Sequence, residues 1–191
     1  MTKTKSSFIN MFLSLTLISL AASAILGTVY EYTKIPIEQA YRNKKIEAIK
    51  QVVPEFNNNP YEEMLRLPTN EGDSLEVYPA KMDNAIVGYA ITTYTKQGFS
   101  GDISLMAGFN ADGSICNITV LEHKETPGLG SKMNEPRFKD QFKNINPAKT
   151  VVKVKKDGGQ IDGITAATIS SRAFCDAVQR AYNTLEKGDL E

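Results

Sequence analysis

The chain has 191 residues, of which 41% are hydrophobic and 23% charged, a length and balance that suit one folded domain with an appendage. Its 22 basic and 22 acidic residues cancel, and no basic stripe stands out, so nucleic-acid binding has no support. A single histidine excludes a histidine-rich metal site. The two cysteines, Cys116 and Cys175, have no CxxC or metal-type spacing, which favours two small buried hydrophobic residues and leaves a disulfide as the alternative.

The first predicted element is an apolar segment at residues 8–30, which follows Lys3 and Lys5 and contains no charge. As a helix that rises 1.5 Å per residue, a segment of this length can cross a hydrocarbon core of about 30 Å. A cleaved signal peptide is the competing interpretation, because Ala22-Ser23-Ala24 has the small-residue form of a cleavage site. The apolar run continues past that site, so we expect residues 8–30 to form an uncleaved transmembrane helix after a short N-terminus at residues 1–7.

The orientation of this span cannot be taken from its flanking charges. More basic residues follow the span than precede it, but a long domain after a span is translocated largely regardless of its charge. Residues 31–60 are expected to form a juxtamembrane helix and a linker. Pro36 suits the first turn of a helix, and helical spacing of apolar residues continues up to Pro54, where this helix should end. The sequence Asn57-Asn58-Asn59-Pro60 predicts a loop.

Residues 61–191 are predicted to form one domain of the α+β class. Runs rich in β-branched and aromatic residues predict strands at 75–78, 85–94, 102–109 and 114–121, the last two joined as a hairpin by a turn at 110–113. A short helix is expected at 136–143. An edge strand is expected at 150–155, where lysine charges would discourage pairing with another chain. The final helix should end near Gly188 and place four apolar residues in one stripe: Phe174, Val178, Ala181 and Leu185. This order indicates an antiparallel sheet with flanking helices.

Residues 162–172 contain the strongest candidate for a binding site. A helix that begins near 169–171 leaves its first N–H groups unpaired and carries partial positive charge, so a phosphate is a natural ligand there. Ser170 and Ser171 could donate hydroxyl hydrogen bonds, Arg172 could add a charged one, and the small Ala166 and Ala167 allow close approach. The simpler interpretation is a helix cap, in which Thr168, Ser170 or Ser171 bonds a backbone N–H.

The same residues carry a resemblance to a known family. Asp162, Thr165, Ala166, Ala167 and Thr168 match the flavinylation motif of FMN-binding domains, except that Ala166 stands where a glycine is usual. Together with the anchor, this stretch resembles the G-subunit family of the Rnf (Rsx) electron-transport complexes. The resemblance implies that a separate flavin transferase esterifies the phosphate of FMN to the Oγ of Thr168. It also implies that Asp162 and Thr165 belong to the signal that the transferase reads.

A second motif supports the resemblance. The string Glu125-Thr126-Pro127-Gly128-Leu129-Gly130 follows the predicted hairpin, and its glycines make a tight loop with exposed N–H groups. An ordinary turn would also explain two glycines, but the whole string is similar to the flavin-pocket loop of that family. The resemblance implies an apolar contact from Leu129, polar contacts from Glu125 and Thr126, and backbone contacts at Gly128 and Gly130. The turn Gly98-Phe99-Ser100-Gly101 is a weaker match, with Phe99 either in the pocket or in the core.

The resemblance implies a membrane-anchored electron-transfer subunit with covalent FMN and no catalytic side chain or metal ligand of its own. Its domain would lie on the extracytoplasmic (periplasmic) side of the inner membrane. Its partners would be other membrane subunits of a complex that couples electron transfer between ferredoxin and NAD to ion translocation. The homologous C subunit of the sodium-translocating quinone reductase is one alternative, although it is generally longer. A membrane-anchored binding or assembly module without flavin is the other.

Overall fold

The computed structural model describes residues 8–69 and 71–188, so the predicted cytoplasmic N-terminus at residues 1–7 lies outside the described residues. The chain divides into two units, residues 1–43 and 44–191. Helix α1 (Phe8–Val52) supplies all of the described part of the first unit. Among the described residues, α1 is the one helix long and apolar enough to cross a membrane, and its apolar stretch is exposed. The expected second helix starting at Pro36 is wrong, because Pro36 lies inside the single continuous helix α1.

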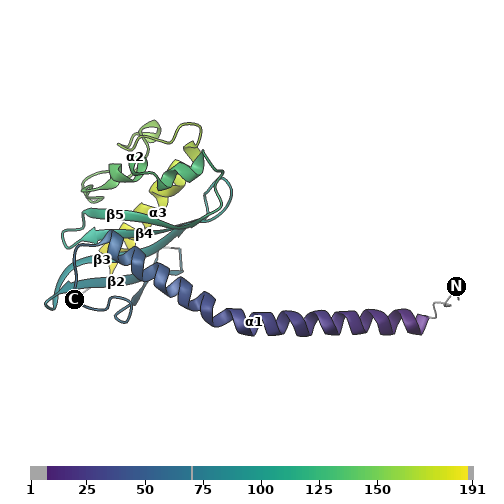
Figure 1. Ribbon diagram of the computed structural model, residues 1–191. Helices are drawn as coiled ribbons and strands as arrows, with labels where there is room; N and C mark the ends of the chain where they lie inside the picture. The colour runs from purple at the N-terminus through teal and green to yellow at the C-terminus, as the bar shows by residue number, and fades with distance from the viewer. Residues whose placement is uncertain (1–7, 70, 189–191) are drawn as a thin grey trace. The chain divides into compact units, whose positions relative to one another are not determined.

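The second unit is built on one antiparallel sheet with strands in chain order, β1 to β5 (Figure 1). The strands are β1 (Leu65–Pro68), β2 (Ser74–Met82), β3 (Ala85–Thr95), β4 (Ile103–Asn110) and β5 (Ile115–His123). The predicted hairpin of β4 and β5 is confirmed, and the whole is the α+β fold that the sequence predicted. Strand β1 was missed because it is short, mostly exposed and ends in a proline, so it lacks an alternating pattern.

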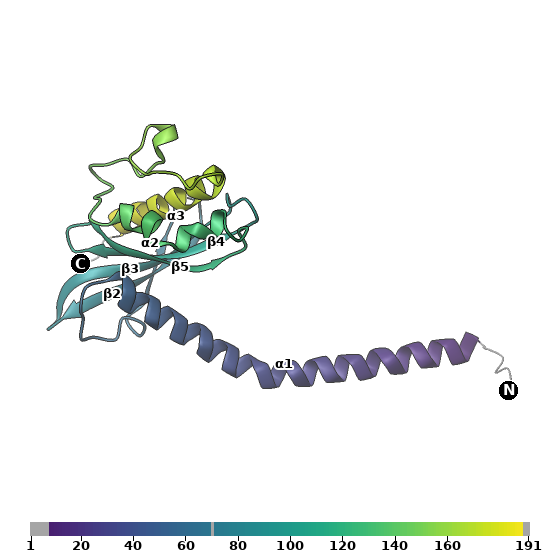
Figure 2. The same ribbon diagram turned by 45° about the horizontal axis from the view of Figure 1, so that its top comes forward.

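The sheet is buried on both faces, because alternate side chains of a strand point to opposite sides. One face packs against helix α3 (Thr168–Lys187), which crosses β3 and β4. Neighbouring strand residues such as Ile91 and Ala90 belong to the two different cores. The second core is completed by the last turns of α1, through Ala48, Ile49 and Val52. Figure 2 shows α3 and helix α2 (Pro136–Lys139) on the same side of the sheet.

The chain between β5 and α3 contains short helical turns rather than further strands. These are η1 (Gly130–Asn134), α2 (Pro136–Lys139), η2 (Asp140–Phe142) and η3 (Lys155–Asp157). The predicted helix at 136–143 is therefore split, but its two aromatic residues do share one face. Phe138 and Phe142 both pack against Phe174 of α3, with ring centroids 5.1 and 5.0 Å away.

The predicted edge strand at 150–155 is wrong. Only one isolated bridge, between Val154 and Ile161, forms in this segment. The chain turns back at Gly158, which has a φ of +82°, and a Cβ on Gly159 would lie 2.0 Å from the carbonyl oxygen of Lys153. This tight return places Val154 in the core and leaves no length for a strand. Both cysteines are free: Cys175 is buried in α3, where burial raises the pKa of its thiol to about 12, and Cys116 is half-buried on β5.

Candidate functional site

A cavity of about 320 Å³ lies at the N-terminal end of α3. Three segments that are distant in the sequence form its wall: the β3–β4 turn, the loop after β5, and the stretch that leads into α3. The lining residues are Phe99, Glu125, Thr126, Leu129, Gly130, Ala166, Ala167, Thr168, Ile169 and Ser170. The structure thus places most of the predicted cofactor-binding residues around one cavity, whose size falls within the range of small-molecule sites.

Glu125 joins the three segments. Its side chain is buried, at 5% exposure, and both carboxylate oxygens accept hydrogen bonds. Oε1 accepts from the backbone N–H of Ser100 at 3.0 Å, and Oε2 accepts from the hydroxyl of Ser170 at 2.6 Å. A hydrogen bond to a charged group is stronger than one between neutral groups, so this carboxylate holds the β3–β4 turn and the first turn of α3 against the loop after β5.

The first turn of α3 opens onto the cavity without a side-chain cap. Ala167 occupies the N-cap position and makes no side-chain hydrogen bond, so no side chain caps the helix from that position. Of the three residues named in the helix-cap interpretation, Ser171 does accept a hydrogen bond from a backbone N–H, that of Ile164. The side chain of Thr168, the first helical residue, makes no hydrogen bond within the described part of the chain and is half-buried at the cavity wall. Uncapped N–H groups and the helix dipole together favour an anion at this end of α3.

Ala166 shapes the approach to the helix with an unusual backbone conformation. Its φ is +60°, in the left-handed region that costs an L-residue about 1–2 kcal/mol. This is the position at which the family motif usually has glycine, the residue that adopts a positive φ without steric cost. Alanine at this site keeps the geometry at the expense of local strain.

Apolar side chains surround the mouth of the cavity. Phe99, Leu129 and Ile169 are 68%, 41% and 49% exposed, and all three line the cavity. Ile169 was not predicted from the sequence, although its place directly after Thr168 could have suggested it. A flat aromatic ligand can cover such side chains and remove them from water. The cavity therefore has one end whose helix start favours an anion and one end that is apolar.

Four predicted site residues lie outside the cavity lining. Ser171 is buried and uses its hydroxyl within the helix start, accepting from the N–H of Ile164 and donating to the carbonyl of Ala167, each at 2.9 Å. The N–H of Gly128 donates to Ser131 Oγ at 2.9 Å. Asp162 and Thr165 line two other cavities, of about 390 and 350 Å³. Thr168 lines the second of these as well as the 320 Å³ cavity, so it lies between them.

Arg172, a predicted phosphate partner, is engaged elsewhere. Its guanidinium donates two hydrogen bonds of 2.6 Å to the carboxylate of Asp157, and this bond holds the pKa of Asp157 below its ordinary value. His123 also has a structural position that its sequence context did not reveal. Its Nδ1 accepts a hydrogen bond from the N–H of Glu125 at 3.2 Å, which stabilises the start of the loop after β5.

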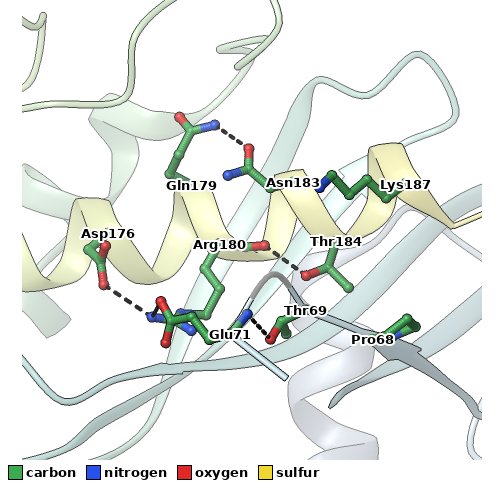
Figure 3. A pocket seen from close by; sticks show the side chains of 9 residues that line it. All are labelled: Pro68, Thr69, Glu71, Asp176, Gln179, Arg180, Asn183, Thr184 and Lys187. Atoms are coloured by element: carbon green, nitrogen blue, oxygen red, sulfur yellow. Dashed lines mark hydrogen bonds and ion pairs between the residues drawn. The ribbon is translucent and has the colours of Figure 1, made fainter. Parts of the chain in front are cut away.

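A smaller cavity of about 110 Å³ lies beside the opposite end of α3 (Figure 3). Its most prominent cation, Arg180, is bonded to Glu71 at 2.8 Å and lies 3.9 Å from Asp176. The pair with Glu71 attaches the helix to the turn after β1, whereas Asp176 belongs to α3 itself, so the cavity lies beside a contact that stabilises the fold. Within residues 8–69 and 71–188, no group of His, Cys, Asp and Glu side chains could hold a metal ion.

Comparison with known proteins identifies the domain class. The family model for the FMN-binding domain matches residues 98–183, a range that contains every residue of the 320 Å³ cavity wall. The fold is therefore that of an FMN-binding domain. This result agrees with the resemblance seen in the sequence motifs.

The relatives narrow this class to one family. The G subunit of an ion-translocating oxidoreductase complex from Haemophilus influenzae (strain PittEE) is 34% identical, covering 86% of this chain and 83% of that protein. The protein of the same name from Methanosarcina acetivorans is 32% identical, covering 89% and 90%. The chain belongs to this G-subunit family. The C subunit of the Na(+)-translocating NADH-quinone reductase from Parabacteroides distasonis is a more distant structural match, with 19% identity, a TM-score of 0.48 and coverage of 72% of this chain and 78% of that one.

Proposed function

We propose that this protein is a membrane-anchored electron-transfer subunit of an Rnf-type complex, and that it carries FMN bound covalently through its phosphate to Thr168 Oγ. The complex would couple electron transfer between ferredoxin and NAD to ion translocation. Its other membrane subunits would be the partners of this chain. The domain would lie on the periplasmic side of the inner membrane, held there by α1.

The observation that carries the proposal is the position of Thr168. Its hydroxyl lies at the uncapped start of α3, on the wall of a cavity whose other end is apolar. The N–H groups of the first helical turn would bind the phosphate oxygens, and the apolar side chains Phe99, Leu129 and Ile169 would contact the ring system. The residues present therefore fit FMN in both size and chemistry.

The covalent bond would be formed by a separate flavin transferase. Ester formation joins Thr168 Oγ to the phosphorus of an activated FMN, and the leaving group of that donor takes up the threonine proton. Asp162 and Thr165 lie on the outer side of the same loop, where they line other cavities, and we assign them to recognition by the transferase. When bound, the flavin supplies the electron chemistry, while the protein orients it and limits its contact with water.

The test is whether flavin stays on the denatured polypeptide. The full chain is expressed with a flavin transferase, denatured and separated on a gel, and the protein band is examined for flavin fluorescence. We expect fluorescence on the wild type and its loss in Thr168→Val. Thr150→Val is the matched control, because this threonine lies outside the cavity lining and should keep the flavin. Fluorescence retained in Thr168→Val would contradict the covalent assignment, and its absence from the wild type would favour a binding or assembly module.

A further inference from the structure

The carboxylate of Glu125 has a site built around it. Besides the N–H of Ser100 and the hydroxyl of Ser170, two glycines make room for it. A Cβ on Gly130 would lie 2.4 Å from Glu125 Oε2, and a Cβ on Gly98 would lie 2.9 Å from Oε1. These separations are shorter than van der Waals contact, so any larger residue at Gly130 or Gly98 would displace the carboxylate.

The charge of this carboxylate is not neutralised by a cation. No ion pair to Glu125 forms within the described part of the chain. Both of its oxygens have hydrogen-bond partners, the N–H of Ser100 and the hydroxyl of Ser170. Its partner Ser170 lies in the first turn of α3, whose N-terminal dipole stabilises a nearby anion. Two hydrogen bonds and a helix end therefore hold a buried negative charge in place, and they weaken its field without cancelling it.

We infer that Glu125 is a positioning residue for the flavin whose fixed negative charge lowers the flavin's reduction potential. This inference rests on the proposed function. Glu125 lines the same cavity wall as Thr168 and Leu129, so a charge on this side chain would act on the volume that the flavin would occupy. Reduction adds electrons to the ring, and a buried anion opposes that addition because charges interact strongly where water is excluded.

The test compares the reduction potential of the bound flavin in charge-altering variants of the full chain at pH 8. Dithionite supplies the electrons, and solvent supplies any protons that the reduced ring takes up. Glu125→Gln keeps the size of the side chain and removes the charge, so the potential should rise, with the equilibrium for reduction shifted about tenfold or more toward the reduced form. Glu125→Asp keeps the charge and should leave the potential close to that of the wild type.

Glu122→Gln is the matched control, because it removes an exposed carboxylate from the end of the neighbouring strand β5, where solvent and salt screen its charge. This variant should leave the potential unchanged. An unchanged potential in Glu125→Gln, or equal shifts in the Gln and Asp variants, would overturn the inference and leave the covalent flavin assignment intact. A wild type without bound flavin would instead remove the proposed function and this inference with it.

A second variant decides the question if Glu125→Gln fails to fold or to take up flavin. Ser170→Ala removes one hydrogen-bond donor from the carboxylate and keeps its charge, so the field at the flavin becomes stronger. The potential should then fall below that of the wild type, opposite in sign to the effect of Glu125→Gln. An unchanged or higher potential in Ser170→Ala would overturn the inference.

Discussion

Arg172 donates two hydrogen bonds of 2.6 Å to Asp157, and this pair attaches the first turn of α3 to the η3 turn. The planar guanidinium matches both carboxylate oxygens, which fixes the direction of the side chain. Arg172 is consequently absent from the lining of the 320 Å³ cavity, although its sequence position suggested a phosphate ligand. A residue beside a binding motif can therefore stabilise the segment that carries the motif without contacting the ligand.

The first prediction follows from that pair. Arg172→Gln should leave the amount of covalently bound flavin unchanged, because the lost contact is with Asp157 and not with the cavity. The measurement is flavin fluorescence per polypeptide after denaturation. A loss of flavin as complete as that in Thr168→Val would show that Arg172 binds the cofactor directly.

The second prediction concerns Ala166 and its φ of +60°. Ala166→Gly should stabilise the domain by about 0.5–1 kcal/mol, because relief of the left-handed strain exceeds the added entropy of the unfolded chain. The measurement is urea unfolding of the full chain in detergent, followed by circular dichroism. Ala173→Gly, at a buried position inside α3, is the opposite control and should destabilise by about 1 kcal/mol or more. Equal destabilisation in both variants would contradict the strain at Ala166.

The third prediction concerns the room that Gly130 leaves for Glu125 and Ser170. A Cβ at this position would lie 2.4 Å from Glu125 Oε2 and 2.6 Å from Ser170 Oγ, so Gly130→Ala should break their hydrogen bond. We expect a destabilisation of about 1–3 kcal/mol and a large loss of bound flavin. In Gly128→Ala, nothing lies within 4 Å of the new Cβ, and the φ of +75° adds only backbone strain. That control should keep its flavin, and similar flavin loss in both variants would contradict the clash.

The fourth prediction concerns the ion pair between Lys45 at the end of α1 and Glu76 on β2. Burial alone would raise the pKa of Glu76, but hydrogen bonds from Lys45 and Tyr78 outweigh it and hold the pKa below its ordinary value of 4.5. Lys45→Met should destabilise by about 1–2 kcal/mol at pH 7, a value reduced for the partial exposure of Glu76.

The pH dependence of this effect has a definite sign. A carboxylate whose pKa is depressed by folding stabilises the protein above its unfolded pKa, and this contribution is lost as the pH falls through the folded value. The difference between wild type and Lys45→Met should therefore be largest near neutrality and shrink below about pH 4.5. Urea unfolding at a series of pH values measures it. A difference that stays constant down to pH 3 would assign the effect to packing of the lysine stem.

The fifth prediction concerns the anchor and the side on which the domain lies. A protease added to intact spheroplasts should degrade the domain, since we place it outside the cytoplasm. Protection until the cells are lysed would reverse the proposed orientation.

Mass spectrometry of the purified protein should find the segment at 8–30 intact, and a mature chain that begins near Ile25 would show that it is a signal peptide.

Local patterns in the sequence were enough to predict much of the fold. Strands β2 to β5 follow from runs of β-branched residues, and the stripe of Phe174, Val178 and Ala181 indicates the buried face of α3. The strand prediction at 150–155 failed because alternation of valine and lysine looks the same in a strand and in a tightly turning loop. The difference lies in the turn at Gly158 and Gly159, whose N–H groups donate to the carbonyl oxygens of Lys155 and Val154, each at 3.1 Å.

The sequence by itself determined which chemical groups the candidate site has: a threonine at the start of a helix, a glycine-rich loop, and an apolar anchor. These signals are local, and short-range sterics and hydrophobic spacing are sufficient to produce them. Only the tertiary structure decided which of those residues face one cavity, because that depends on contacts between segments far apart in the chain. The hydrogen bond between Glu125 and Ser170, 45 positions apart, closes the cavity wall, while the bond between Arg172 and Asp157 takes a neighbouring side chain away from it.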